Sequence, residues 1–283
     1  MPDIAGLLLD ATRRLKEAGI EGPRQDAVLL LSEAAGLSPD RVRLQPETAL
    51  APDIAARFEA LMQRRLAREP VSQILGRREF WGLDFHVTRD VLDPRPDSET
   101  LVAGALAAIS DRGAAWRIVD FGTGSGCLLL SLLHELPNAT GLGVDASPAA
   151  LEIARGNAEQ LGLASRVDFR QGDWGTGLEG PFDILISNPP YIESAVVPEL
   201  APEVARHEPR LALDGGADGL DAYRRLVPHM ARLAAPGAFA ALEIGLGQDA
   251  AVSALLAGAG FAGIVVLPDL AGVGRVVTGR KSR

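Results

Sequence analysis

The chain has 283 residues, of which 47% are hydrophobic and 23% charged, and its formal net charge at pH 7 is −9. This composition predicts a globular protein of one large domain or two, and no apolar run approaches the roughly 18 residues of a membrane span. The acidic balance disfavours stable nucleic-acid binding, because neutralised phosphates supply most of that affinity. We therefore expect a cytoplasmic protein that binds neither membrane nor nucleic acid.

The first quarter of the chain has apolar residues at helical spacing. Helices are expected over 3–18, 23–36, 52–69 and 71–75, with a short helical turn near 38–40. Together they predict a small helical bundle at residues 1–76. Its apolar stripes must pack on each other or on a partner, so the bundle is either a stabilising cap or a docking domain for the substrate.

The pattern changes near residue 79. Residues 79–87 combine aromatic and β-branched side chains around Gly82, which predicts a β-hairpin within a linker at 77–92. Pro94 and Pro96 then forbid a regular element, and Asp97 or Ser98 is expected to cap the helix that follows.

From Trp116 onward, strand and helix patterns alternate, which indicates a doubly wound, mostly parallel sheet. Only five residues separate the last two expected strands, so these form an antiparallel hairpin. We assign the catalytic domain to 93–283. The expected strands are 116–121, 140–145, 166–171, 182–187, 237–244, 262–267 and 273–279, and the expected helices are 126–136, 148–161, 218–234 and 247–259.

A glycine-rich loop follows the first strand of this sheet, at 122–126. Its glycines allow a ligand to approach the backbone and the N-terminus of the next helix, where free N–H groups favour an anion. A dinucleotide site needs glycine at the sixth position, where Cys127 stands, and no Gly-Lys-Ser/Thr follows for a phosphate loop. The ligand is therefore neither NAD nor a nucleoside triphosphate.

Acidic and aromatic residues follow the next two strands. Asp145 can accept two hydroxyls of a ribose, Asp173 can accept an exocyclic amine, and Trp174 can stack on a purine. An adenosine site without dinucleotide spacing predicts S-adenosylmethionine as the cofactor. The expected contacts are Gly122, Thr123, Gly124, Ser125, Gly126, Asp145, Asp173, Trp174 and Asn188.

Metal and thiol chemistry are not expected. The four histidines lack ligand spacing, and the single cysteine, Cys127, excludes an internal disulfide and is interpreted as a packing residue.

Asn188-Pro189-Pro190-Tyr191 follows the apolar strand 182–187. The two prolines remove backbone donors and stiffen the loop, so its carbonyls can face a ligand. The Asn188 side-chain oxygen and the Pro189 carbonyl could each accept one N–H of a planar NH2 group, while Tyr191 packs on its face. The alternative is an ordinary strand-to-loop turn.

With these residues in place, the chain resembles the glutamine-N5 methyltransferases that modify peptide chain release factors. The resemblance rests on 78–81, 94–99, 120–126, 188–191, 207–210 and 213–216. It implies a Rossmann-like methyltransferase fold, S-adenosylmethionine contacts at Gly122 to Gly126, Asp145, Trp174 and Asn188, and a target glutamine received by Asn188 to Tyr191. That glutamine is the one in the Gly-Gly-Gln motif of class-1 release factors.

The chain departs from the family pattern at Asp93, His207 and Gly274. Whether Arg95, Glu99 and His207 contact cofactor or substrate is open. Two alternatives remain. Adenine-N6 methyltransferases of nucleic acids also carry an Asn-Pro-Pro-Tyr element, and a non-enzymatic adaptor could keep the cofactor fold for structural reasons alone.

Overall fold

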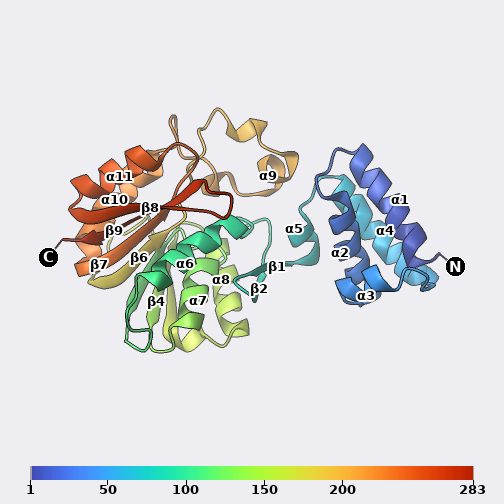
Figure 1. Cartoon of the computed structure of the whole chain (residues 1–283), viewed down its shortest axis with the longest axis horizontal. Coiled ribbons are helices and arrows are strands. Elements are labelled where there is room, and N and C mark those ends of the chain that lie inside the picture. Colours follow the sequence, from blue (N-terminus) through green and yellow to red (C-terminus); the bar gives the residue numbers. More distant parts are fainter. Residues whose placement is uncertain (1, 283) are drawn as a thin grey trace. The chain divides into compact units, whose positions relative to one another are not determined.

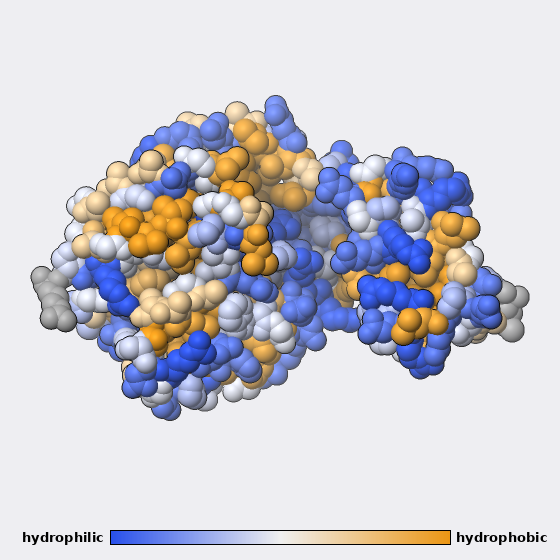
Figure 2. Space-filling model, in the orientation of Figure 1, coloured by the Kyte–Doolittle hydropathy of each residue, from blue (hydrophilic) through white to orange (hydrophobic). Residues whose placement is uncertain are grey.

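The computed structural model describes residues 2–282, which divide into two compact units. One contains the residues up to Arg77 together with 201–207, and the other contains 78–200 and the chain from Glu208 onward. Within the described residues, no helix combines the length and the apolar character that a membrane crossing requires. On the face drawn in Figure 2, each unit displays both hydrophilic residues and clusters of hydrophobic ones.

The helical unit begins with α1 (Ile4–Glu17), α2 (Pro23–Ala35), α3 (Pro39–Leu44), α4 (Pro52–Leu66) and α5 (Val71–Leu75) (Figure 1). Proline occupies the first turn of α2, α3 and α4, where its missing N–H costs no helical hydrogen bond. Leu15, Leu31 and Met62 are completely buried in a core that these helices share. The helices expected from periodicity are thus present.

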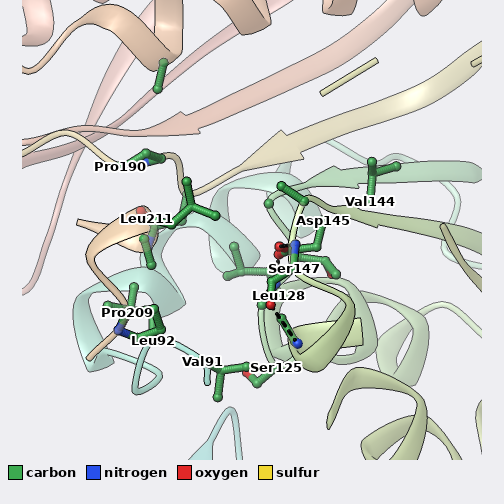
Figure 3. A pocket seen from close by; sticks show the side chains of 18 of the residues that line it. Val91, Leu92, Ser125, Leu128, Val144, Asp145, Ser147, Pro190, Pro209 and Leu211 are labelled. Atoms are coloured by element: carbon green, nitrogen blue, oxygen red, sulfur yellow. Dashed lines mark hydrogen bonds between the residues drawn. The ribbon is translucent and has the colours of Figure 1, made fainter. Parts of the chain in front are cut away.

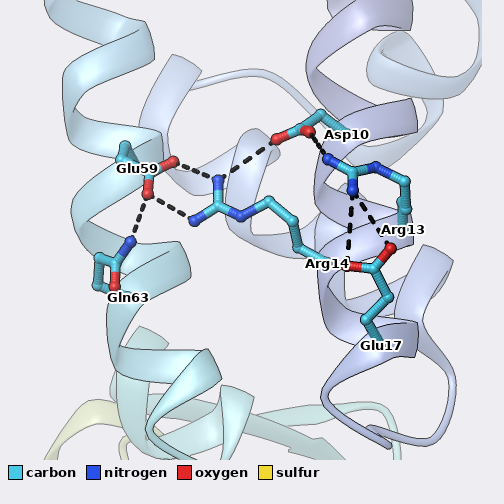
Figure 4. Close-up of polar contacts among 6 residues, drawn as sticks. All are labelled: Asp10, Arg13, Arg14, Glu17, Glu59 and Gln63. Atoms are coloured by element: carbon cyan, nitrogen blue, oxygen red, sulfur yellow. Dashed lines mark hydrogen bonds and ion pairs between the residues drawn. The ribbon is translucent and has the colours of Figure 1, made fainter.

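Arg14 links α1 to α4 (Figure 4). Its two terminal nitrogens each donate to a carboxylate oxygen of Glu59 at 2.7 Å, and Gln63 Nε2 donates to Glu59 Oε1 at 2.6 Å. The hydrogen bonds from Arg14 lower the pKa of Glu59. This bidentate ion pair fixes the two helices relative to each other better than a surface ion pair with one contact would.

A short segment from later in the chain completes the helical unit. Helix α9 (Pro202–His207) supplies Glu203, which pairs with Arg65 at 3.0 Å and with Arg68 at 3.2 Å. Arg65 is only 5% exposed and also donates to Asp26 at 2.7 Å, so its buried charge is balanced from two sides. The assignment of all of 93–283 to the catalytic domain is therefore wrong for 201–207. Periodicity could not reveal this long-range ion pair.

The expected hairpin is present as β1 (Arg77–Phe80) and β2 (Leu83–His86), and the other unit begins within it, at Arg78. The rings of Phe80 and Phe85 meet edge to face at 6.2 Å. A single 3-10 turn, η1 (Pro96–Ser98), leads into α6 (Glu99–Ala107). Ser98 occupies the N-cap position of this helix, as one of the two predicted residues, but its side chain makes no capping hydrogen bond.

The central sheet has seven strands in the order β5-β4-β3-β6-β7-β9-β8 (Figure 1). Strands β3 to β7 run parallel, and β9 is antiparallel to both β7 and β8, which confirms the predicted fold. The strands are β3 (Arg117–Phe121), β4 (Thr140–Asp145), β5 (Val167–Gln171), β6 (Phe182–Ser187), β7 (Ala234–Glu243), β8 (Phe261–Pro268) and β9 (Gly274–Lys281).

Helices cover both faces of the sheet. Residues of α6, α7 (Cys127–Glu135) and α8 (Pro148–Gln160) share a core with Ile118 and Ile184, whereas α10 (Asp221–Leu233) and α11 (Asp249–Gly258) share one with Val119 and Leu185. Neighbouring residues of one strand thus enter opposite cores, as the pleat requires, and this explains the continuous apolar runs of β3 and β6.

Strand register determines where the site forms. Phe121 lies opposite Val144 of β4 and Ser187 of β6, and Asp145 lies opposite Gln171 of β5. The carboxyl ends of these four parallel strands therefore meet at one edge, and the loops that follow them converge there.

Candidate active site

A pocket of about 370 Å³ lies in the catalytic unit at this edge of the sheet (Figure 3). The loops after β3, β4, β5 and β6 contribute to its wall, together with residues 90–95 and 209–216. The sequence-predicted site residues that line it are Gly122, Thr123, Gly124, Ser125, Asp145, Asp173, Trp174, Asn188 and Pro190. Three predicted residues, Gly126, Pro189 and Tyr191, are not among the described residues in its wall.

The glycine loop is held by its own backbone. The amides of Gly122 and Thr123 donate to the Val144 carbonyl at 2.8 and 3.0 Å, and the amide of Gly126 donates to the Thr123 carbonyl at 2.8 Å. Gly122, Gly124 and Gly126 all have positive φ, which side chains rarely tolerate. The strand and the turn thus bind these loop amides, and the predicted preference for an anion at the N-terminus of the next helix stays a prediction.

Asp145 connects the glycine loop to the next helix. Its Oδ2 accepts from the Gly124 amide at 2.9 Å and its Oδ1 from the Ser147 amide at 2.9 Å. A carboxylate oxygen has two lone pairs, so each oxygen retains capacity for a second donor. Asp145 lines the pocket, and each of its carboxylate oxygens can accept one more hydrogen bond. The pair of oxygens can therefore accept two neighbouring hydroxyls of a ribose.

A second acid, Asp120, accepts a hydrogen bond from the same glycine loop. Asp120 is 1% exposed and its Oδ2 accepts from the Thr123 hydroxyl at 2.8 Å. Burial raises the pKa of Asp120 to about 7. Thr123 therefore turns its hydroxyl inward. Asp120 precedes the loop by two residues and was not among the predicted site residues.

The third strand end combines an ion pair with an aromatic ring. Asp173 accepts from Arg225 Nη2 at 2.7 and 2.6 Å, and both side chains are more than half exposed. Trp174 adopts a positive φ of 51°, and its ring lies 3.9 Å from the point where a Cβ on Gly122 would stand. The ring therefore sits over the glycine loop. Arg225 of α10 also lines the pocket and was not predicted.

Asn188 enters the pocket directly after β6. Its Nδ2 donates to Ser98 Oγ at 3.3 Å, and the preceding Ser187 hydroxyl donates to the Phe121 carbonyl at 2.6 Å, which ties the ends of β6 and β3 together. Pro189 is buried. Tyr191 directs its hydroxyl to Glu243 Oε1 at 3.3 Å, and burial raises the pKa of this tyrosine.

The segment that follows Asn188 is held by contacts with Gln248 and Gly215. Gln248 Nε2 donates to the Tyr191 carbonyl at 3.0 Å and to the Gly219 carbonyl at 3.2 Å. A Cβ on Gly215 would lie 2.8 Å from the Pro190 carbonyl oxygen, so only glycine permits this approach. The loop is thus rigid for two reasons, its prolines and its tertiary contacts.

The structure distinguishes the three residues whose roles were open. Arg95 lines the pocket and its Nη2 donates to Glu208 at 2.6 and 2.8 Å. Burial raises the pKa of Glu208 to about 7. Glu99 instead accepts from the Trp81 amide at 2.9 Å, and His207 belongs to α9 of the helical unit. Asp93, a departure from the family pattern, lies 3.7 Å from Arg95.

Cys127 also faces the pocket, in the first turn of α7. Burial raises the pKa of its thiol to about 12, which leaves it protonated and unreactive at neutral pH. Across residues 2–282, His, Cys, Asp and Glu side chains form no group of three or more that could hold a metal ion.

Comparisons with known proteins match both units. Residues 6–76 match the family described as PrmC N-terminal domain, and residues 113–213 match a family described as Methyltransferase domain. A release factor glutamine methyltransferase of Rhodospirillum rubrum is 48% identical over 279 residues, covering 98% of this chain and 85% of the relative. One of Cereibacter sphaeroides is 46% identical over 276 residues, covering 98% of both.

Among solved structures, the fold is similar to that of the hMettl16 catalytic domain in complex with the MAT2A 3′UTR hairpin 6. The TM-score is 0.60 and the identity 17%, over 89% of this chain and 92% of that one. A methyltransferase from Pyrococcus furiosus gives a TM-score of 0.52 at 16% identity, over 81% of this chain and the whole of the other. At these identities the likeness establishes the fold.

Proposed function

Because the chain belongs to the family of release factor glutamine methyltransferases, we propose that it methylates the side-chain amide nitrogen, N5, of a glutamine. The substrate is the Gly-Gly-Gln motif of class-1 peptide chain release factors, and the cofactor is S-adenosylmethionine. One observation carries the proposal: Asn188 lines the same pocket as Asp145 and Trp174. An amide held at Asn188 therefore lies in one cavity with the residues suited to an adenosine.

The residues present fit this cofactor. Asp145 has acceptor capacity left for ribose hydroxyls, Trp174 offers a ring for adenine, and the backbone at Gly122 to Gly124 lies open to the pocket. When bound, S-adenosylmethionine supplies an electrophilic methyl group on a positively charged sulfur. Gly122, Thr123, Gly124 and Gly126 already donate their amides within the chain, and bound amides favour a phosphate less than free amides do.

Asn188 and Pro189 would hold the substrate amide. An amide nitrogen is a weak nucleophile, because its lone pair is delocalised into the carbonyl. If the Asn188 Oδ1 and the Pro189 carbonyl each accept one N–H, they orient the nitrogen and support the positive charge that develops on it. The nitrogen becomes acidic as it is methylated, so its proton can pass to solvent without a strong base.

The helical unit is the proposed docking surface for the release factor, because an isolated glutamine offers little area for binding and remote contacts must hold it in line. A chain without residues 1–76, once shown to be folded, should have a raised KM for the intact release factor and little change in affinity for S-adenosylmethionine. Translation termination takes place in the cytoplasm, where we propose that the protein acts.

The test is a methyl-transfer assay with intact class-1 release factors, read by mass spectrometry of the Gly-Gly-Gln peptide. A single added methyl group on the glutamine supports the proposal. Methylation of adenine in added DNA or RNA, with no transfer to the release factor, would replace it by nucleic-acid methylation. Absence of turnover on every substrate would favour an adaptor.

A further inference from the structure

We propose that Asn157 of α8 is a positioning residue for cofactor binding, because it joins two segments of the pocket wall. One segment is the glycine loop, which contains Ser125, and the other is 90–95, which follows the hairpin strand β2. Ser125 and Val91, one from each segment, both line the pocket (Figure 3). Asn157 itself is not among the described residues of the wall. The inference rests on the cofactor site proposed above and extends it.

Asn157 is completely buried, and its side chain binds main-chain groups only. Its Oδ1 accepts from the His86 amide at 2.7 Å. Its Nδ2 donates to the His86 carbonyl at 3.1 Å and to the Ser125 carbonyl at 2.9 Å. An asparagine NH2 group has two N–H donors, so both are used. Because the two carbonyls can only accept, they fix which end of the side-chain amide faces each partner.

Both main-chain groups of His86 are thus bound by one side chain. His86 is the last residue of β2, which pairs with β1 in a two-stranded sheet. The Asn157 amide has the same donor and acceptor groups as a peptide bond, so it takes the place of a neighbouring strand where the hairpin ends. Four residues later, Asp90 lines the pocket. The chain therefore enters the pocket wall directly from this anchor.

The third hydrogen bond of Asn157 reaches the glycine loop. Ser125 precedes Gly126, the N-cap residue of α7, so its carbonyl lies outside the hydrogen-bond ladder of that helix. Ser125 is buried, and a buried carbonyl needs a donor. Asn157 supplies that donor. One NH2 group thereby binds both the end of β2 and the loop that forms the facing part of the cofactor site.

An apolar cluster holds the same segment against the N-terminal part of α8. Val87 and Val91 are buried with Ala150. The Ala150 amide donates to the Ser147 hydroxyl at 3.2 Å, and the Ser147 amide donates to Asp145 at 2.9 Å. The segment that Asn157 anchors therefore packs beside the residues that hold Asp145, the proposed ribose acceptor. Displacement of this segment would change the pocket at that acid.

The same helix provides a matched control. Gln160 lies three residues after Asn157 and also binds the hairpin, because its Nε2 donates to the Asp84 carbonyl at 2.9 Å. Gln160 is exposed, and within the described chain its side chain makes no hydrogen bond to the glycine loop. Its removal should therefore cost one contact with the hairpin and leave the two wall segments joined.

Two substitutions test the inference, Asn157→Leu and Val87→Ala, with Gln160→Ala as the control. Leucine has a branched shape similar to that of asparagine but can neither donate nor accept a hydrogen bond. Val87→Ala weakens the apolar anchor of the same segment and leaves every polar group paired, and Val87 is not among the described residues of the pocket wall. Calorimetric titration would give the Kd of S-adenosylmethionine, and hydrogen exchange would report on the main-chain amides.

Asn157→Leu should weaken binding of S-adenosylmethionine roughly tenfold, because three main-chain groups lose their partner and both wall segments loosen. Exchange should rise at 86–95 and at 122–126 together. Val87→Ala should weaken binding by a smaller factor and raise exchange at 86–95. Gln160→Ala should keep the wild-type Kd and raise exchange only within the hairpin. A role in folding alone would lower the Tm of the Asn157 variant and leave its Kd unchanged.

The inference is overturned if folded Asn157→Leu binds S-adenosylmethionine with wild-type affinity. If that variant does not fold, an unchanged Kd in Val87→Ala overturns it instead. Asp145→Ala, titrated in the same way, separates the two levels of the argument. Wild-type affinity in Asp145→Ala would remove the proposed cofactor site and the inference with it. Weak binding by Asp145→Ala, beside wild-type affinity in Asn157→Leu and Val87→Ala, would refute only the positioning role.

Discussion

Two of the loops that line the pocket, those after β3 and β6, are stabilised in different ways. The glycine loop after β3 is held by neighbouring main chain, through the Val144 carbonyl and the adjacent Asp145. The Asn188 loop after β6 is held by side chains from distant parts of the sequence, Ser98, Glu243 and Gln248. We infer that the first loop provides cofactor affinity and the second provides the rate of transfer, so substitutions should separate the two quantities.

The largest expected effect is on the rate of methyl transfer. Asn188→Ala should lower the single-turnover rate of methyl transfer by on the order of 100-fold or more, because one preorganised acceptor is lost where charge develops. The dissociation constant for S-adenosylmethionine should change little. Asn138→Ala, an exposed asparagine elsewhere in the unit, is the control. Equal loss of affinity and rate would show that the two loops share their functions.

Asp145→Ala should have the complementary effect. It should weaken S-adenosylmethionine binding by about 1–3 kcal/mol, since ribose hydroxyls and the Gly124 amide lose a charged acceptor. Calorimetric titration measures the change, and circular dichroism checks the fold. Asp168→Ala, at an exposed position of β5, serves for comparison. An unchanged dissociation constant would remove Asp145 from the cofactor site.

Gln248→Ala tests the Asn188 loop without altering the pocket wall, because Gln248 binds the Tyr191 carbonyl and does not line the pocket. Loss of its bond to the Tyr191 carbonyl should loosen the loop and lower kcat roughly tenfold, with unchanged cofactor affinity. Gln171→Ala removes an exposed glutamine with a single bond to the Ala146 carbonyl and should not change kcat. Identical kcat values for the two variants would contradict this role of Gln248.

The smallest expected effect concerns stability and is shared by both regions. Burial raises the pKa of Asp120 beneath the glycine loop and of Glu243 behind the Asn188 loop, each to about 7. The folded state then binds more protons than the unfolded chain between about pH 4.5 and 7, so the free energy of unfolding falls as pH rises through this range.

Asp120→Asn and Glu243→Gln should each reduce that fall, by on the order of 1 kcal/mol between pH 5 and 8. Urea unfolding at the two pH values measures it. If the free energy of unfolding decreases between pH 5 and 8 by the same amount in both variants as in the wild type, neither acid titrates near neutrality.

The comparison also separates what sequence reasoning could and could not find. Asp145 ends β4, Trp174 lies three residues after β5 and Asn188 follows β6 directly. The parallel sheet brings these strand ends together, so their meeting in one pocket was predictable. Glu243 carried a detectable signal, an acid at the end of an apolar strand. Gln248 and Arg225 carried none, because they are polar residues in loop and helix patterns that normally face solvent.

Local periodicity and backbone chemistry can be read from the sequence. They predict the order of helices and strands, the carboxyl-edge position of the site and the stiffness that two prolines give its loop. Three features come from long-range contacts instead. Ser98 binds Asn188 rather than capping its own helix, and residues 201–207 join the helical unit through Glu203 and Arg65. The amides of Gly122, Thr123, Gly124 and Gly126 are bound within the chain. These outcomes depend on which polar groups become buried beside one another across long stretches of chain, and burial of such groups forces them to find partners that no local pattern specifies.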